Sequence, residues 1–477
     1  MISRSMALAV AVAALLPVVL IGCSTPPKAW ELPPPPVQAS RIVAEGALTR
    51  VTLPNGLRVL LLEDRSLPTV SLGLTIRRGI AIEAKGKEGV ADLTAEVMRR
   101  GAGDRDALAI ARAVDELGAQ FGAAASWDSM GIMAGGLSRD ATTLLELVAD
   151  VALRPTFDEG EFEKARDEQL AGLKASLDNP STLLGWQLER TLYPDHRYGV
   201  PGSGLPETVG QLALEDVRGF HARLFHPNNA IFYATGDFDS EKLIEQIRVA
   251  LGSWRPGPVP KPVAAPPGEV PTARKIIVID RPEMGQVQVA VAHEGLRRSD
   301  RRRIGASLLN GVLGGSGFSS RLMLKLRSER GLTYSIRSGF VLRRHPGRFG
   351  IATFTRADQA REAIDLLLAE VEAIRSTNPV TEQELINTKA FSVGQFSLGL
   401  ETSAAVMGSL VNLEVYDLPR DSLDTFRARI QAVTREDVAK LAGELLHPSR
   451  AAIVIVGPAK VLLPKLKGLG EIQTVEW

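Results

Sequence analysis

Glu215-Asp216-Val217 is followed downstream by His226-Pro227-Asn228-Asn229-Ala230-Ile231-Phe232. The same pattern occurs twice in the chain, which indicates a duplicated architecture. Glu436-Asp437-Val438 and His447-Pro448 repeat its two landmarks, each 221 residues later. Chance produces single local echoes readily, but it rarely produces two at one offset. The repeat therefore predicts two homologous halves.

A further echo and a proline-rich stretch place the boundary between the halves. Pro155-Thr156-Phe157-Asp158-Glu159 is echoed by Pro379-Val380-Thr381-Glu382-Gln383 at an offset of 224 residues. Residues 254–271 are rich in proline, which is typical of a linker. We expect a first domain at 45–255, a linker at 256–274 and a second domain at 275–477.

The residue pattern of the first half mixes strands and helices. Branched apolar residues predict strands at 59–62 and 70–76. Helical spacing of apolar and charged residues predicts helices at 87–100, 104–118, 140–152 and 158–178. We therefore expect an α+β fold in which each half is a mostly antiparallel sheet covered by helices on one face. The formal net charge of +1 over 477 residues gives no indication of nucleic-acid binding.

The N-terminus has the features of an export signal. Arg4 precedes an uncharged, almost wholly apolar run from Met6 to Gly22, which predicts a signal peptide at 1–22. Leu20-Ile21-Gly22-Cys23 resembles the lipobox of bacterial lipoproteins, and Cys23 is the only cysteine. This predicts a lipid on Cys23 and a proline-rich spacer at 23–44. Ser24 in place of an aspartate, by resemblance to sorted lipoproteins, favours the periplasmic side of the outer membrane.

Four motifs, in order along both halves, resemble the pitrilysin/insulinase family of zinc peptidases. They are the hairpin Val51-Thr52-Leu53-Pro54-Asn55-Gly56-Leu57-Arg58-Val59, Gly89-Val90-Ala91 before a helix, the His-Pro turn at His226, and Gly314-Gly315-Ser316-Gly317 with Ser320-Arg321-Leu322. The resemblance implies two domains that form half of a clamshell.

The resemblance also implies a zinc site, which this sequence lacks. Active members carry His-x-x-Glu-His on the helix after Gly-Val-Ala, and a later glutamate completes the ligand set. Here Asp92 and Glu96 stand for the two histidines, Ala95 for the catalytic glutamate and Gly172 for the third ligand. We therefore expect this chain to bind no zinc and no other cofactor, and Asp92 and Glu96 to form a solvated acidic face. The alternative is that Asp92 and Glu96, one helical turn apart, hold a hard cation weakly.

No second catalytic constellation replaces the zinc motif. None of the six histidines stands at a recognisable ligand spacing from a helical carboxylate (His196, His221, His226, His293, His345 and His447). The chain has no Gly-x-Ser-x-Gly elbow, and the glycine run at 314–317 lacks the Lys-Ser/Thr of a phosphate loop.

Arg327 and Tyr334 match an arginine and a tyrosine that the family keeps seven residues apart. In the family this pair contacts the substrate backbone and the tetrahedral intermediate at a zinc site in another domain or subunit. Both groups are suitable donors for a developing oxyanion. The alternative is that Arg327 is an ordinary surface charge and that Tyr334 begins a buried strand.

The resemblance implies a non-zinc-binding subunit of a heterodimeric periplasmic metallopeptidase, inactive alone, that acts on peptides with a homologous zinc-bearing partner. The main alternative is a non-catalytic peptide-binding or scaffold lipoprotein. The stretch Gly122-Ala123-Ala124-Ala125-Ser126-Trp127-Asp128 lies where the family's substrate-holding strand is expected, and an exposed strand edge can hold a peptide. A self-sufficient zinc peptidase would need ligands that the sequence does not supply.

Overall fold

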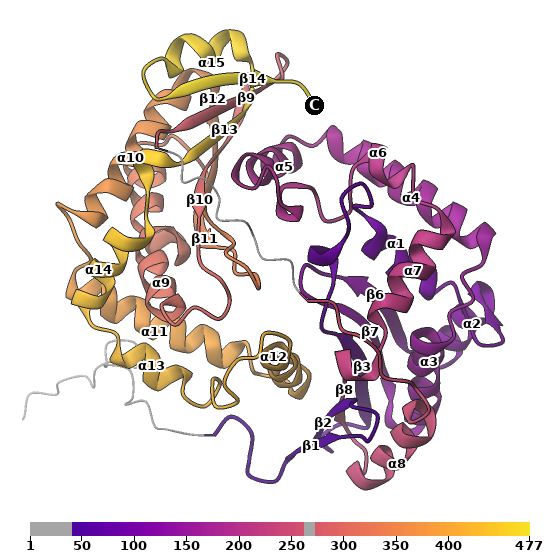
Figure 1. Cartoon of the computed structure of the whole chain (residues 1–477). Helices are drawn as coiled ribbons and strands as arrows, with labels where there is room; N and C mark the ends of the chain where they lie inside the picture. Colours follow the sequence, from indigo (N-terminus) through magenta and orange to yellow (C-terminus); the bar gives the residue numbers. More distant parts are fainter. Residues whose placement is uncertain (1–40, 262–271) are drawn as a thin grey trace, which may run out of the picture. The chain divides into compact units, whose positions relative to one another are not determined.

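The structure, a computed structural model, describes residues 41–261 and 272–477. Two six-stranded sheets organise these residues, and each sheet takes its strands from one half of the chain (Figure 1). The predicted signal peptide, Cys23, most of the spacer and the middle of the linker lie outside the described residues. No helix within the described ranges is long and apolar enough to cross a membrane.

The first sheet has the strand order β1-β2-β8-β3-β7-β6, so β6 lies at an edge. All neighbouring strands are antiparallel except β2 and β8, which are parallel. The strands are β1 (Leu48–Thr52), β2 (Arg58–Glu63), β3 (Thr69–Ile76), β6 (Gln120–Ala125), β7 (Met130–Leu137) and β8 (Ala230–Gly236). Two short strands, β4 (Gly101–Ala102) and β5 (Arg105–Asp106), form a separate ribbon.

The predicted hairpin at 51–59 joins β1 to β2 through Asn55 and Gly56. Gly56 has a φ of +88°, which a residue without a Cβ adopts at no steric cost. The Asn55 side chain accepts a hydrogen bond from the Leu57 N–H at 3.2 Å and donates one to the Leu251 carbonyl at 2.8 Å. The turn is therefore attached to the last helix of the first half.

Helices cover one face of this sheet and bury Val70, Leu72 and Leu74 of β3 beneath them. The helices of the first half are α1 (Val90–Met98), α2 (Ala107–Glu116), α3 (Ala141–Leu153), α4 (Glu159–Leu177), α5 (Pro180–Leu192), α6 (Pro206–Val209), α7 (Leu214–Leu224) and α8 (Ser240–Leu251). The four helices and two strands predicted from the sequence correspond to α1 to α4, β2 and β3.

The second sheet has the order β11-β12-β10-β13-β9-β14, with β13–β9 and β9–β14 parallel and the other pairs antiparallel. Its strands are β9 (Lys275–Asp280), β10 (Gln286–Glu294), β11 (Ile336–Phe340), β12 (Arg348–Arg356), β13 (Ala452–Gly457) and β14 (Glu471–Val475). Its helices are α9 (Arg303–Asn310), α10 (Ala360–Arg375), α11 (Glu382–Leu398), α12 (Ser403–Val415), α13 (Phe426–Ala432), α14 (Arg435–Leu445) and α15 (Ala459–Leu466). Both sheets are mostly antiparallel, as predicted.

The sequence repeat corresponds to a repeated structural unit. α7 and α14 begin with the same device, in which the carboxylate of Asp216 or Asp437 accepts a backbone N–H from the residue before the helix at 2.9 Å. Val217 and Val438 are fully buried one position later. Each helix leads through a His-Pro turn into an interior strand of its sheet, β8 or β13. The two halves are therefore built on one plan.

One helix of each half packs against the sheet of the other half. Val406 and Leu410 of α12 pack with Leu60 and Leu62 of β2. In return, α5 packs its buried leucines against apolar residues of β9, β10 and β13. The expectation of helices on a single face was therefore incomplete, because these exchanged helices cover part of the second face of each sheet.

Candidate degenerate metal site and Arg–Tyr pair

α1 carries the positions that match the zinc motif, and Gly89 fixes where this helix starts. Gly89 has a φ of +100°, and a Cβ there would lie 2.6 Å from the Ser203 carbonyl oxygen. Only glycine fits this conformation without strain. The helix therefore begins at Val90 rather than at residue 87, and the Gly-Val-Ala motif has a steric cause.

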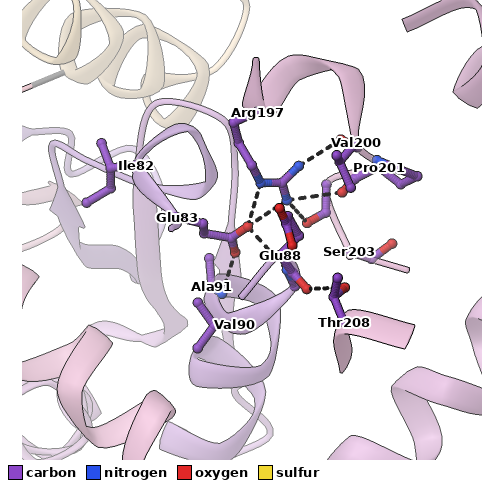
Figure 2. A network of polar contacts seen from close by, with 12 residues as sticks. Ile82, Glu83, Glu88, Val90, Ala91, Arg197, Val200, Pro201, Ser203 and Thr208 are labelled. Atoms are coloured by element: carbon purple, nitrogen blue, oxygen red, sulfur yellow. Dashed lines mark hydrogen bonds and ion pairs between the residues drawn. The ribbon is translucent and has the colours of Figure 1, made fainter. Parts of the chain in front are cut away.

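A buried ion pair holds the start of α1 (Figure 2). The Arg197 guanidinium lies 2.6 Å from the Glu83 carboxylate, and their side chains are 5% and 0% exposed. Glu83 also accepts the backbone N–H groups of Gly89 and Ala91 at 3.2 and 2.7 Å. Arg197 donates to the carbonyls of Val200, Pro201 and Gly202. Burial outweighs these contacts and raises the pKa of Glu83 to about 7.

Asp92 lies in the first turn of α1 and is only partly accessible to solvent. Burial raises the pKa of its carboxyl to about 6, although the positive charge of Arg197 opposes this shift. The expectation of a solvated acidic face does not hold for Asp92, because helix α1 packs against α7, α4 and β6.

Glu96, at the second histidine position, is engaged by two arginines. Arg99 and Arg100 donate to its carboxylate at 2.6 and 2.5 Å. Arg100 also pairs with Glu168 of α4 at 2.5 Å and approaches Glu161 at 3.7 Å. The Arg100 guanidinium therefore provides the positive charge that the carboxylates of Glu96, Glu161 and Glu168 face. Glu96 is not the open acidic group that the sequence suggested.

Ala95 and Gly172 provide no chemistry at the two remaining positions. The Ala95 methyl is buried and cannot accept a proton. Gly172 lies exposed on α4, where a Cβ would meet nothing within 4 Å. One turn earlier, Gln169 donates its amide to the Gly89 and Ser203 carbonyls, which ties α4 to the start of α1.

These residues do not fit a zinc ion. Zinc sites in enzymes require about three protein ligands, preferably imidazole nitrogen or thiolate sulfur. Asp92 has a raised pKa, Glu96 is occupied by arginines, and Gly172 has no side chain. In the part of the chain that the structure describes, no group of three or more His, Cys, Asp or Glu residues is arranged to hold a metal.

The histidines serve structural roles in the described residues. The His196 ring nitrogen accepts the Tyr198 N–H, and His293 accepts the His447 N–H. His221 lies 2.9 Å from the Ala152 carbonyl. Burial lowers the pKa of His196, His221 and His293 to about 4, so their neutral forms persist at neutral pH.

Arg327 and Tyr334 lie in contact in the second half. The Arg327 guanidinium carbon is 4.4 Å from the Tyr334 ring centroid and 4.6 Å from that of Phe318. Tyr334 is 71% exposed and Phe318 is 68% exposed. No carboxylate pairs with Arg327 anywhere in residues 41–261 or 272–477. The alternative that Tyr334 begins a buried strand is wrong, because it precedes β11 on the surface.

Two structural features hold this aromatic–arginine stack in place. Arg327 lies in a π-helical turn, Met323–Glu329, a rare conformation that is frequent at functional sites. Next to Tyr334, the buried Thr333 hydroxyl donates to the Ser335 carbonyl at 2.9 Å and accepts the Thr353 hydroxyl at 3.0 Å. The backbone on either side of Tyr334 is therefore fixed while its ring projects outward.

Strand β6 provides an open sheet edge beside α1. It covers the first part of the stretch proposed to hold peptides and pairs only with β7. Trp127 and Asp128 lie in the following turn, and the second half anchors both. Arg343 stacks on the Trp127 ring at 4.1 Å, and Asp128 accepts the Arg344 N–H and the Tyr416 hydroxyl at 2.9 and 3.0 Å.

The sequence reasoning missed Arg197 and Phe318. Arg197 is far along the chain from α1, and no local pattern links it to Glu83. The sequence did contain a signal for Phe318, because a large aromatic residue directly after the Gly-Ser-Gly stretch is unusual for a solvated turn. The matched pair Arg327 and Tyr334 is therefore part of a stack of three residues.

Comparisons with known proteins agree with this architecture. The profile of insulinase (peptidase family M16) matches residues 58–202, and that of the peptidase M16 inactive domain matches residues 211–391. An uncharacterized zinc protease of Streptomyces coelicolor is 28% identical, covering 87% of this chain and 90% of its own. The beta subunit of the mitochondrial-processing peptidase of Bos taurus is 24% identical, with coverage of 89% and 87%.

Solved structures show the same fold. A peptidase M16 inactive domain from Pseudomonas fluorescens has a TM-score of 0.80 at 28% identity and covers 86% of this chain and 98% of its own. A protease from Helicobacter pylori has a TM-score of 0.79 at 21% identity, with coverage of 86% and 99%. Two M16 profiles match in succession along the chain, and the two sheets are built on one plan. The chain therefore belongs to peptidase family M16, the pitrilysin/insulinase family.

Proposed function

We propose that this chain is the non-zinc-binding subunit of a heterodimeric periplasmic metallopeptidase, held at the outer membrane by a lipid on Cys23. It would supply Arg327 and Tyr334 to the zinc site of a homologous partner, with which it would form a clamshell. The observation that carries the proposal is the exposed Phe318–Arg327–Tyr334 stack in a chain whose own metal positions are Asp92, Ala95, Glu96 and Gly172.

The stack has the chemistry of an oxyanion-binding group. A guanidinium and a phenol both donate hydrogen bonds, and donors positioned in advance can lower a reaction barrier by several kcal/mol. Both rings contact the guanidinium through cation–π interactions, which do not use its N–H groups as hydrogen-bond donors. Because no carboxylate in the described chain neutralises Arg327, its charge is available to an external group.

Relatives support the idea of a partner. The bovine relative is by name one subunit of mitochondrial-processing peptidase, and a structural neighbour with a TM-score of 0.75 at 19% identity comes from complex III of Candida albicans. This chain has the Phe318–Arg327–Tyr334 stack but a degenerate zinc motif on α1, so a homologue with an intact zinc motif would supply what it lacks. This favours assembly with a homologue over independent activity.

The test is reconstitution with a zinc-bearing M16 homologue from the same cell. We expect the purified chain to hold no stoichiometric zinc by elemental analysis and to leave an unstructured quenched peptide uncut. We expect the mixture to form a one-to-one complex on size-exclusion chromatography and to cleave that peptide. Stoichiometric zinc on this chain, with chelator-sensitive cleavage by it alone, would show that the proposal is wrong.

The second candidate function is a peptide-binding scaffold, and the open edge of β6 favours it. A peptide can add to this edge as a further strand through backbone hydrogen bonds. Binding of a peptide by this chain, with no gain in cleavage when the homologue is added, would support the scaffold and contradict the catalytic subunit.

A further inference from the structure

A basic groove lies between α9, α13 and α14 of the second half, and neither Arg327 nor Tyr334 lines it. Its volume is about 420 Å³, and its apolar lining includes Ile304, Val433 and Leu441. Arg301, Arg429 and Lys440 line it as well. In the described structure α9 packs against both α13 and α14, so the groove is a formed feature of the second half (Figure 1).

The acidic residues of the groove are already engaged. Glu444 pairs with Arg302 at 3.4 Å and with Lys440 at 3.8 Å. Asp437 caps α14 by accepting the Thr434 N–H at 2.9 Å. Among the described residues, no carboxylate pairs with Arg301 or Arg429. The groove therefore has a surplus of positive charge directed at solvent.

Arg303 reinforces this surplus from behind the groove. It is partly buried, and burial together with the like charges of Arg298 and Arg429 lowers the pKa of its guanidinium. Arg298 donates to the Asn412 side-chain oxygen at 3.1 Å, which is an uncharged acceptor. Arginines gathered without carboxylates repel one another, and a bound anion relieves that repulsion.

The predicted lipid tether reaches the body beside this groove. The Ile42 N–H donates to the Asp424 carboxylate at 2.8 Å, and Ile42 and Val43 pack near Leu423. Asp424 lies two residues before α13, and Arg429 lies within this helix. A helix of seven residues is about 10 Å long, so the contact of Ile42 lies within a short distance of the groove residue Arg429.

We propose that this groove docks the protein on anionic phospholipid headgroups of the membrane that carries its anchor. One guanidinium group can bind two oxygens of a phosphate at once. The attraction between basic residues and an anionic bilayer increases as the distance between them falls. The proposal rests on the lipid anchor of the proposed function but not on the zinc-bearing partner. Docking would fix which face of the chain is presented to the periplasm.

The groove can be tested without the lipid. All four hydrophobic cores lie within the described residues, so a chain that starts at Ser24 keeps the groups that fold it. Its cosedimentation with vesicles of phosphatidylcholine is compared with that for vesicles containing about one third phosphatidylglycerol. We expect binding only to the anionic vesicles, and loss of binding when salt shortens the screening length to about 3 Å at 1 M.

Charge reversal at the groove gives the matched comparison. Each cation near an anionic surface raises the binding constant roughly fivefold. The double variant Arg301→Glu with Arg429→Glu should therefore bind anionic vesicles about twentyfold more weakly, or weaker still. Arg112→Glu with Arg255→Glu changes the net charge equally at exposed positions of the first half and should weaken binding by much less. Circular dichroism melting curves check that both variants are folded.

Three outcomes would overturn the proposal. The first is equal binding to both kinds of vesicle, and the second is equal loss in the two double variants. The third is displacement by free inorganic phosphate when chloride at the same ionic strength has no effect, because that identifies a discrete phosphate site. Binding of an acidic peptide such as polyglutamate, with no binding to anionic vesicles, assigns the groove to a protein partner and also contradicts it.

Discussion

The Arg327 guanidinium lies over the Tyr334 ring, with 4.4 Å between its central carbon and the ring centroid. Arg327 lies near the end of the π-helical turn, and Gly331, with a φ of +61°, brings the chain back toward this helix. Leu332 then donates its N–H to the Leu326 carbonyl at 2.8 Å. This turn converts a spacing of seven residues into a contact.

Phe318 should position Arg327 without contacting substrate itself. Phe318→Ala removes one face of the stack, so we expect cleavage by the reconstituted pair to fall by roughly a few-fold, since cation–π contacts at exposed sites contribute about 0.5–1 kcal/mol. Phe318→Tyr keeps the ring and should restore the rate. Because Phe318 is 68% exposed, the melting temperature should barely change. An equal loss of rate in both variants would contradict a role for the ring.

Glu83→Gln should destabilise the chain strongly at about pH 9, where the Glu83 carboxyl, with its pKa of about 7, is ionised. The change leaves the buried Arg197 charge with backbone carbonyls only, and breaking one side of a buried pair typically costs about 3–5 kcal/mol. Glu245→Gln, which breaks the exposed pair with Arg248, should cost less than about 1 kcal/mol. Urea unfolding followed by tryptophan fluorescence measures both. Similar midpoints for the two variants would show that the Glu83–Arg197 pair does not support α1.

Asp92→Asn should change how stability depends on pH. Burial raises the pKa of Asp92 from 3.8 to about 6, so the folded protein holds this proton more tightly than the unfolded chain does. The wild type therefore loses stability from this group as pH rises from about 4 to about 6, by up to about 3 kcal/mol at roughly 1.4 per pKa unit. Below about pH 4 Asp92 is protonated in both the folded and the unfolded state, so no stability is lost there.

The asparagine cannot titrate, so the stability of Asp92→Asn relative to the wild type should increase across that pH window. Urea unfolding at about pH 4 and at about pH 7 gives the difference. Asp167→Asn, at an exposed position of α4, serves as the control and should show little change. A relative stability of Asp92→Asn that falls with rising pH would contradict the burial of this carboxylate.

Cys23 should carry the lipid that anchors the chain. Cells fed a fatty-acid analogue should incorporate it into the wild-type protein and not into Cys23→Ser, because the chain has no other thiol. Equal label in both forms would show that the lipobox interpretation is wrong. This result is independent of the groove, which is measured on the chain without lipid.

The order of elements could be predicted from sequence because it depends on local patterns. The apolar runs of β2 and β3, the acidic caps of α7 and α14, and the Asn55-Gly56 turn each depend on neighbouring residues. The exchange of α5 and α12 between the halves could not be predicted, since both helices resemble ordinary amphipathic segments. Which sheet an apolar helix covers is decided by residues far along the chain.

The site shows the same division. The resemblance to the family indicated Arg327 and Tyr334 as a pair, and the structure brings them into contact. The environments of Asp92 and Glu96 depended on Arg197 and Arg100, so a prediction from helix spacing alone treated both carboxylates as solvated. The burial of an ionisable group is a property of the tertiary structure, and the sequence of one helix does not determine it.

The most direct test of the proposed catalytic role is the rate of peptide cleavage by the reconstituted pair with Tyr334→Phe. This variant removes one exposed hydroxyl and little volume, so the complex should assemble normally. Loss of one oxyanion donor should lower kcat by roughly a hundredfold. Arg327→Lys, which loses the planar fork, should also be impaired. Tyr193→Phe, which removes a buried hydroxyl without a hydrogen-bond partner, and Arg330→Lys should leave the rate unchanged. A wild-type kcat in both Tyr334→Phe and Arg327→Lys, with the complex intact, would contradict the proposed role of this chain in catalysis.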